Sequence, residues 1–483
     1  MTWTLEMDAL DPGGEAVTLR YSLGRYDDPD DRAFDPRIDQ PGLFRAGLFA
    51  GSLIAGDRSS YGETTLINVD GALDALVDYA VDGRHAVISQ GAGAARRTVV
   101  SGTVARLAFE SDRVSVVLRG PLEPLQTPHP QATYAGDNVL PDGLEGTADD
   151  IGGQPKPLVF GEVANATPVL VNSARLIYQV SARDDCEVTA VYDNGAPLAQ
   201  GAAYDSLAAL QGTAPAAGEW RAYRGYVRLG ASPAGTVTLD ATTAAPNAGD
   251  VFATLATERG WSVAAVDVSA LNGLGAVRLY VTEPSDTLDL LDRLAVSVGG
   301  YLNVDADGVL RLRRLEAPQA HGVTIPDHAI VDIQRSAAGA GDNSLPVGRV
   351  TINADRIETT QRDVAGSVSD ARRARLAQQT RAANARRDET LTRHPLAGST
   401  TLDSLLADLT AAQTLADDLV ALLGVRRDLV TLTAPLSEIG PIAVGSAVQV
   451  VTPRLGYAAG RVLLVTGARM DAQRNTLEID LWG

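Results

Sequence analysis

The sequence has 483 residues, yet it contains a single cysteine, a single lysine and no apolar run of transmembrane length. Because Cys186 stands alone, an intrachain disulfide, a four-cysteine zinc site and a cysteine-ligated iron–sulfur cluster are excluded. The amino terminus carries no basic stretch followed by an apolar run, which predicts synthesis without a signal peptide. We therefore expect a protein that is made in the cytoplasm and not stably inserted in a membrane.

Basic residues are outnumbered by acidic ones, 41 against 60, which gives a formal net charge of −19 and a pI of about 4.7. A surface built to hold nucleic acid or an anionic membrane would need an excess of positive charge, so the composition disfavours both partners. The length exceeds what one hydrophobic core supports. With 45% hydrophobic residues, the composition predicts a globular protein of several domains.

Motifs for metal or phosphate binding are weak. Residues 303–308 match the first half of a calcium loop, but Arg314 stands at the twelfth position, where calcium needs a bidentate glutamate. The acidic residues of segment 27–39 could hold a hard cation, yet their spacing and the prolines favour a solvated loop. The glycine-rich segment 91–95 lies between predicted strands and lacks the lysine of a phosphate loop.

The five histidines are scattered without a metal-ligand spacing, and none accompanies a nucleophile motif. They are His85, His129, His321, His328 and His394. Among 60 acidic residues some pair of carboxylates can always be chosen, so a glycoside-cleaving pair cannot be recognised without geometry. We predict a protein without enzymatic activity, metal or cofactor.

Residues 1–121 predict a β-barrel, because apolar residues with period two alternate with glycine and aspartate turns. The predicted strands cover residues 16–21, 43–54, 64–68, 84–90, 97–109 and 114–118. One short helix is expected over residues 72–80, with Leu73, Leu76 and Val77 on its apolar face. Residues 122–157 are rich in proline and glycine, which predicts an extended arm or linker.

Residues 158–245 predict a β domain, with a hairpin turn at Asn194 and Gly195. Its aromatic residues Trp220, Tyr223 and Tyr226 could stack on a sugar, but cross-strand pairing is favoured. Residues 246–318 predict a small α/β domain with helices over residues 251–259 and after Asp286, followed by a hairpin over residues 301–313. The side chain of Asp286 is expected to cap the second helix.

Residues 319–483 predict a second β-barrel that carries a helical insertion over about residues 366–424. Its ending gives the clearest signal, because Leu477, Ile479 and Leu481 alternate with polar residues up to the last strand. The insertion is predicted as an arginine-rich helix over residues 368–391 and a leucine-striped helix over residues 402–423.

These two helices supply the candidate contact residues. The arginine-rich helix could face nucleic acid, but its interspersed acidic residues favour a solvated or inter-subunit face. The leucine stripe is expected to pack against its own domain, with a trimer seam as the alternative. The candidates for subunit or partner contacts are Leu402, Leu405, Leu409, Arg372, Arg373, Arg386 and Arg387.

Four stretches, in order along the chain, resemble those of the baseplate or tail-tip hub proteins of long-tailed, siphovirus-type bacteriophages. They are residues 65–74 (TLINVDGALD) with 82–84 (DGR), residues 158–161 (LVFG), the helix and hairpin of residues 286–316, and the ending at residues 445–482. The resemblance implies a mainly β, multidomain fold with a tube-type β-barrel near each end and a β domain and a small α/β domain between them. It also implies a homotrimer that presents a pseudo-sixfold ring to the hexameric tail tube.

We therefore expect a structural virion protein at the tail tip or baseplate. It would join the tail tube or distal tail protein to other tail-tip proteins and line the channel for genome ejection. DNA would pass transiently without specific binding, and an acidic wall would repel its phosphates. Two alternatives stay open: a tail-tip adaptor or receptor-binding protein, with the arm and the aromatic residues of the β domain as its surface, and a cell-wall-degrading glycoside hydrolase of the tail.

Overall fold

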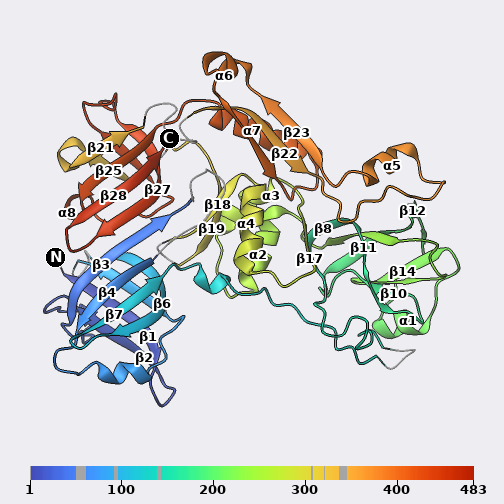
Figure 1. The fold of residues 1–483 in the computed structure, drawn as a ribbon, viewed down its shortest axis with the longest axis horizontal. Coiled ribbons are helices and arrows are strands. Elements are labelled where there is room, and N and C mark those ends of the chain that lie inside the picture. The colour runs from blue at the N-terminus through green and yellow to red at the C-terminus, as the bar shows by residue number, and fades with distance from the viewer. Residues whose placement is uncertain are drawn as a thin grey trace.

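The computed structural model describes residues 2–49, 61–91, 96–138, 143–305, 308–319, 321–336 and 345–483. In these residues the strands form five sheets, with helices concentrated between and beside them (Figure 1). The predicted class, a multidomain and mainly β protein, is confirmed. No helix in the described part of the chain is long and apolar enough to cross a membrane.

The largest sheet has 13 strands and combines the two ends of the chain. Its N-terminal half contains β1 (Trp3–Leu10), β2 (Ala16–Ser22), β3 (Ile38–Gly47), β4 (Tyr61–Ile67), β5 (His85–Gln90), β6 (Arg97–Phe109) and β7 (Arg113–Arg119). Its C-terminal half contains β20 (Val323–Pro326), β21 (Asp332–Arg335), β25 (Leu429–Pro435), β26 (Ala447–Val451), β27 (Arg461–Asp471) and β28 (Thr476–Trp482).

The two halves meet where β3 pairs antiparallel with β27, a junction that we call the seam. Gly47 lies opposite Gly467, and Leu43 lies opposite Asp471. In the described residues the hydrogen-bonded order runs from β2 to β21 without closing on itself. The predicted strands at each end are present, and in the described residues they belong to one sheet in which no closed barrel is detected, so the division into two barrels stays a prediction. Of the predicted strand over residues 43–54, the part beyond residue 49 lies outside the described residues.

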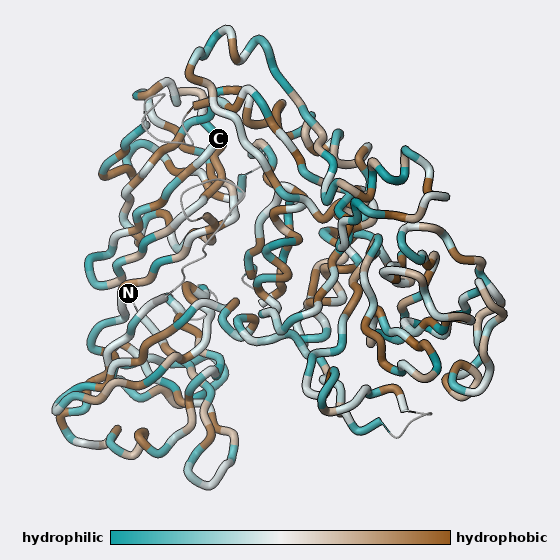
Figure 2. The backbone as a smooth tube through the Cα atoms, turned by 45° about the vertical axis from the view of Figure 1, so that its right-hand side comes forward, coloured by the Kyte–Doolittle hydropathy of each residue, from teal (hydrophilic) through white to brown (hydrophobic). Residues whose placement is uncertain are grey.

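One hydrophobic core lies against both halves of the large sheet. Leu5 and Val116 of the N-terminal half belong to the same buried cluster as Ile479 and Leu481 of the C-terminal half. The apolar residues gather along the strands and in the central helices, where polar positions alternate with them (Figure 2). This alternation arises because successive side chains of a strand point to opposite faces.

The predicted helix over residues 72–80 is shorter in the structure and has a different geometry. It is the 3₁₀ helix η1 (Asp74–Asp78), in which Leu76 is buried and Val77 is 67% exposed. A 3₁₀ helix has three residues per turn, so Leu73 and Leu76 share a face while Val77 turns away from it. The prediction that Val77 packs inward is therefore wrong.

The β domain consists of two five-stranded sheets. Its elements are β8 (Leu158–Ala166), β9 (Val169–Asn172), β10 (Ile177–Gln179), β11 (Cys186–Asp193), β12 (Ala196–Pro197), β13 (Ala199–Gln200), β14 (Glu219–Tyr223), β15 (Tyr226–Leu229), β16 (Val237–Thr243), β17 (Arg278–Val281) and α1 (Leu207–Gly212). The hairpin turn between β11 and β12 is confirmed, because Asn194 and Gly195 both have positive φ, at 48° and 80°. In the segment 122–157, η3 (Glu123–Leu125) comes first, and further along the Tyr134 hydroxyl donates to Gln179 of this domain at 2.7 Å.

The α/β part lies at the centre of the molecule (Figure 1). It comprises α2 (Ala248–Thr257), α3 (Ala265–Asn272), α4 (Thr287–Ser297), β18 (Gly300–Val304) and β19 (Leu310–Arg314), so the predicted helices and hairpin are confirmed. The predicted side-chain cap at Asp286 is wrong. The amide of Thr287 instead donates to the carbonyl oxygen of Thr127 at 3.1 Å, so the preceding arm satisfies the helix end.

The insertion is not the pair of helices that the sequence predicted. Over residues 366–424 it contains α5 (Asp370–Leu376), β23 (Arg381–Arg386), α6 (Asp388–Arg393), β24 (Gly398–Asp403) and α7 (Leu409–Leu423), ahead of α8 (Leu436–Ile439). The preceding strand β22 (Val347–Ala354) joins the same sheet, and we include it in the insertion from here on. The sheet order is β23-β22-β24, and α7 packs on one face of it. Between β20 and β21 lies the short 3₁₀ helix η4 (Asp327–Ala329).

Two local reasons explain this difference. Ala383 and Ala385 are buried while Asn384 and Arg386 are exposed, which is the alternation of a strand. Because alanine and arginine have a high helix propensity, the sequence pattern favoured a helix here. The leucine-striped helix begins only at residue 409, because the Asp408 side chain accepts from the Thr410 amide and caps it. Tertiary packing against α7 therefore overrides the local preference for helix.

Candidate functional site

The face of the large sheet opposite its core is polar and continues across the seam. We call it the polar face. Side chains on it alternate with the buried ones of the same strands, so their direction follows from the strand pleat. Near the seam it carries Arg45, Glu63, Thr431, Thr433, Arg469, Glu478 and Asp480.

Charges of both signs lie on the polar face. Arg469 lies opposite Arg45 on β3 and opposite Glu478 on β28. The Arg469 and Glu478 side chains approach to 3.3 Å, and they are 47% and 41% exposed. The Thr431 hydroxyl donates to Asp480 at 2.9 Å. Arginine therefore accompanies the acidic residues that a DNA-repelling wall was expected to carry.

A hollow of about 450 Å³ opens in the polar face at the seam. Its floor includes Gly47 and Gly467, which face each other across the seam and have no side chains to fill the space. A Cβ atom added to Gly467 would lie 3.0 Å from Asp480 Oδ2. The lining includes Arg469 and Glu478 as well as Phe49, Leu429 and Trp482, so polar and apolar groups meet in this hollow between the two halves of the sheet.

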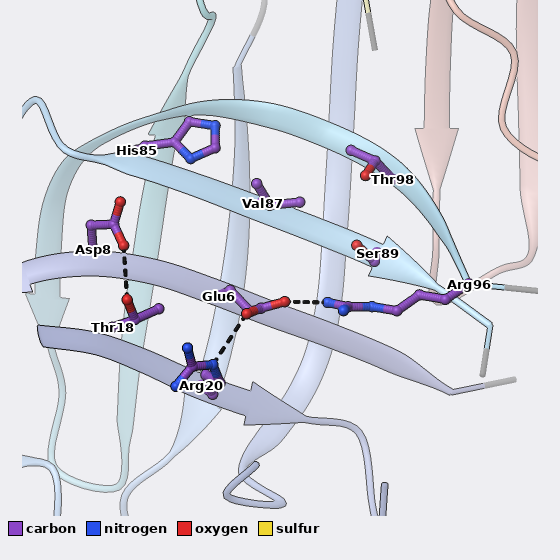
Figure 3. A pocket seen from close by; sticks show the side chains of 9 residues that line it. All are labelled: Glu6, Asp8, Thr18, Arg20, His85, Val87, Ser89, Arg96 and Thr98. Atoms are coloured by element: carbon purple, nitrogen blue, oxygen red, sulfur yellow. Dashed lines mark hydrogen bonds and ion pairs between the residues drawn. The ribbon is translucent and has the colours of Figure 1, made fainter. Parts of the chain in front are cut away.

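A second hollow of about 450 Å³ lies over β1, β2 and β5 in the N-terminal half (Figure 3). Glu6 stands in its middle and accepts from Arg20 at 3.1 Å, from Arg32 at 3.3 Å and from Arg96. Asp8, two residues along the same strand, accepts from Thr18 at 3.1 Å (Figure 3). Each carboxylate in this hollow is therefore engaged by a donor of the chain.

The charge state of Glu6 bears on the glycoside hydrolase alternative. Burial raises the pKa of Glu6, but hydrogen bonds and charge from Arg96, with a hydrogen bond from Arg20, outweigh it and leave the pKa below its ordinary value. A general acid for glycoside cleavage needs the opposite shift, so that it holds its proton near neutral pH. Glu6 is held as a carboxylate, and the hydrolase alternative gains no support from this hollow.

The predicted arginine contacts separate into two groups. In α5, the Arg372 guanidinium lies 3.7 Å from the centre of the Tyr192 ring, and its Nε donates to the Gly195 carbonyl at 2.9 Å. Arg372 therefore fastens the insertion to the β domain. Arg373 is a half-buried neighbour in the same helix. The role of either arginine in a partner contact stays a prediction.

Arg386 and Arg387 lie at the other end of the insertion, beside α6. Arg386 pairs with Asp388 and is 60% exposed, and Arg387 lies 3.5 Å from Glu389. Arg386 is at the surface and Arg387 is half-buried, with 33% of its side chain exposed, and their contact with another chain stays a prediction.

The predicted leucine contacts lie against their own chain. Leu402 is on β24, opposite Ile352, rather than on a helix. Leu405 is buried, and Leu409 is the first residue of α7. All three belong to or pack against the central core, which includes α2 and α4. This agrees with packing inside the domain, and a role in subunit contacts stays a prediction.

In the acidic loop of residues 27–39, which could have held a cation, arginine side chains pair with the carboxylates. Arg32 forks onto Asp28 at 2.8 and 3.0 Å, and Arg37 contacts Asp35 at 2.6 Å. Within the described ranges, no three His, Cys, Asp or Glu residues are grouped so that they could hold a metal. Residues 306 and 307 of the calcium-like segment and 92–95 of the glycine-rich segment lie outside the described residues.

The aromatic residues of the β domain pair across strands, as favoured from the sequence. Tyr223 lies opposite Tyr226 in the hairpin of β14 and β15. Trp220 is 1% exposed, and its Nε1 donates to the Leu198 carbonyl at 3.3 Å. Because Trp220 is buried, it cannot stack on a sugar in this structure.

Sequence reasoning missed a buried carboxylate that joins three parts of the chain. Asp355, directly after β22, accepts from Arg278 of β17, Arg375 of α5 and Arg381 of β23. Asp355 also has a positive φ of 50°, which is uncommon outside glycine. The only available signal was an aspartate that directly follows a strand with period-two apolar residues.

No protein-family model matches this chain, and no curated protein matches it. Solved structures match over its length. The tail protein from Neisseria meningitidis covers 99% of this chain and 96% of its own, at 10% identity and a TM-score of 0.45. The alignment with the 43 kDa tail protein of prophage MuSo2 from Shewanella oneidensis covers 100% of this chain and 96% of that protein, with 9% identity and a TM-score of 0.43. The alignment with a prophage tail protein from Listeria monocytogenes covers 100% of this chain and 94% of that protein, with 8% identity and a TM-score of 0.42. All three of these structures are tail proteins, two of them from prophages.

Proposed function

We propose that this chain is a structural protein of a phage tail, namely the hub of its tip or baseplate. Three copies form a ring, and the polar face lines the channel of that ring. The observation that carries the proposal is the seam, which fuses strands from both chain ends side by side in one sheet. One chain thereby supplies two adjacent wall segments, and three chains supply the six that a hexameric tail tube would meet.

The polar face suits the wall of a DNA channel. The exposed Arg469 is paired with Glu478 and Asp480 lies beside it, so the positive charge of this arginine is offset where phosphates would pass. Unpaired arginines would hold DNA through the release of counterions and slow its passage. The opposite face of the sheet is committed to the hydrophobic core and cannot be exposed to water.

The proposed place of the protein is the tail tip of the virion. There it joins the tail tube or distal tail protein on one side to other tip proteins on the other. It acts by assembly, without an enzymatic reaction and without a cofactor, and DNA passes without specific binding.

Single-cysteine labelling tests the orientation of the polar face. The native Cys186 is buried, and burial raises the pKa of its thiol to about 12, so it stays unreactive in neutral buffer. Thr431→Cys on the polar face and Ala217→Cys on the exposed surface of the β domain give a matched pair. In assembled tails, we expect a small maleimide to label both variants and a maleimide on a bulky polymer to label only Ala217→Cys.

The unassembled protein provides the control for this experiment. Both reagents should label both variants before assembly, because Thr431 and Ala217 are exposed in the single chain. Equal labelling of Thr431→Cys by the bulky reagent before and after assembly would show that the polar face does not line a narrow channel.

A further inference from the structure

The insertion ends in a basic tip with an exposed leucine. We call residues 386–396, with Arg349, the insertion tip. It carries four arginines, Arg349, Arg386, Arg387 and Arg393, against two acidic residues, in a chain of net charge −19. Leu396 is 79% exposed, more than any other large hydrophobic residue of the described chain. A leucine held in water beside arginines is typical of a contact surface.

Within the tip, like charges lie together. Arg349 is directly opposite Arg386 in the pairing of β22 with β23. Such a pair is unfavourable across two strands unless an acidic group compensates it. Asp388 accepts from Arg386 but is itself 77% exposed, so solvent screens much of its effect. The tip is therefore arranged to meet an acidic surface.

An acidic surface with exposed apolar residues lies at the end of the N-terminal half. We call residues 67–84 and 109–113 the loop end. Between residues 68–84 and 110–113 it has six acidic and two basic side chains. Of the eleven exposed large hydrophobic residues in the described chain, four lie here, namely Ile67, Val69, Val77 and Phe109. The loops are adjacent because the Asn68 amide donates to the Asp112 carbonyl at 2.7 Å.

Part of the loop-end negative charge is paired within the chain, and part of it is exposed at the surface. Arg37 forks onto Asp70 at 2.8 Å through both nitrogens, and Asp74 accepts from Asn68. Asp78 is exposed next to Val77, and Asp112, which lies 4.0 Å from Arg113, is exposed three residues after Phe109. The acidic side chains of the loop end are opposite in charge to the arginines of the insertion tip, and its exposed apolar side chains can pack against Leu396.

We infer that the insertion tip of one copy docks on the loop end of a second copy of this chain. The two surfaces lie far apart in one molecule, with α6 at the top and the N-terminal half at the bottom of Figure 1. A contact between two different surfaces is heterologous, and it closes into a ring when the rotation per copy fits. This inference rests on the trimer of the proposed function and names the surfaces that close it.

Charge exchange between the two surfaces tests the contact. The tip reversal is Arg386→Glu with Arg393→Glu, and the loop-end reversal is Asp78→Arg with Asp112→Arg. The mass of the full chain is measured by light scattering at one protein concentration and moderate salt. We expect three chains for the wild type, one chain for each reversal, and three chains again when both reversals are combined, because each interface then regains opposite charges.

A matched control removes the same number of arginines elsewhere. Arg224→Glu with Arg362→Glu changes two exposed arginines outside both surfaces, and this variant should keep the mass of three chains. Thermal unfolding confirms that each variant is folded. As an independent measurement, Leu396→Cys with Val77→Cys should form links between chains with a short bismaleimide, since Cys186 is buried.

The outcomes separate this contact from the proposed function. Trimers in either reversal alone, or single chains in the combined variant, would overturn the contact and leave the hub proposal standing. A wild-type chain that remains single would overturn a contact that forms between free copies, and the hub proposal would then be decided by the number of copies in assembled tails. Retained trimers that fail to join other tail proteins would assign the tip to a different partner and overturn the contact between copies.

Discussion

Replacing Asp355 by alanine is expected to lower the free energy of unfolding by about 3 kcal/mol, because it leaves arginines buried without their counter-charge. Asp355 is 6% exposed and joins β17 of the β domain, α5 and the sheet of the insertion through Arg278, Arg375 and Arg381. The value lies at the lower end of the range for broken buried pairs, since the Arg381 side chain is 44% exposed and screened by solvent. Urea unfolding at neutral pH measures the loss.

The same carboxylate gives a pH dependence with a definite sign. Burial raises the pKa of Asp355, but the hydrogen bond and charge of Arg278, with the other arginines, outweigh it and hold the pKa below its ordinary value. Its contribution to stability is therefore complete above about pH 4 and is lost as the pH falls through the lowered pKa. The stability difference between the wild type and Asp355→Asn should narrow below that pH. A difference that stays constant down to acid unfolding would contradict this assignment.

Replacing Phe44 by alanine is expected to lower the free energy of unfolding by about 3 to 4 kcal/mol, as for other buried phenylalanines. Phe44 is 5% exposed on β3 and lies opposite Met470 of β27, so its ring belongs to both halves at the seam. It also packs closely over Gly62, where an added Cβ would meet the ring. Since the loss falls on the seam, we expect the two halves to separate more readily, which hydrogen exchange of the β3 and β27 amides would detect.

Phe109→Ala is the matched control for the seam variant, with both variants measured on single chains because Phe109 belongs to the loop end. The chemical change is the same, but Phe109 is 39% exposed, so less apolar area returns to water on truncation. Its unfolding free energy should fall by well under half as much as that of Phe44→Ala. If the free energy of unfolding fell equally in the two variants, packing at the seam would contribute no more to stability than packing at the surface.

The elements that sequence reasoning found are those with a strong local period. The last strand, β28, was predicted because Leu477, Ile479 and Leu481 alternate with polar residues and are all buried. The turn at Asn194 and Gly195 was predicted because both residues tolerate positive φ. In both cases, neighbouring residues alone determine the conformation.

Features that depend on distant residues could not be predicted. The pairing of β3 with β27 joins the two chain ends, and no local pattern in either strand specifies its partner. In β23, alanine and arginine favour a helix locally, but burial of Ala383 and Ala385 against α7 makes a strand. The insertion was misassigned for this reason.

The candidate site was only partly predictable. Arg386 and Arg387 were selected for their place in an arginine-rich segment, and they do lie at the exposed insertion tip. Arg372, chosen on the same grounds, lies on Tyr192 inside the chain. The polar face was not foreseen as a unit, because it is assembled from β3, β27, β28 and β25 only when the seam forms.

The most direct test of the proposed hub is electron cryomicroscopy of an assembled tail that contains this protein. The expected map has three copies around the tail axis, with β27 and β28 of each copy turning Arg469, Glu478 and Asp480 toward the channel. A different number of copies, or three copies whose polar face points away from the axis, would contradict the proposal.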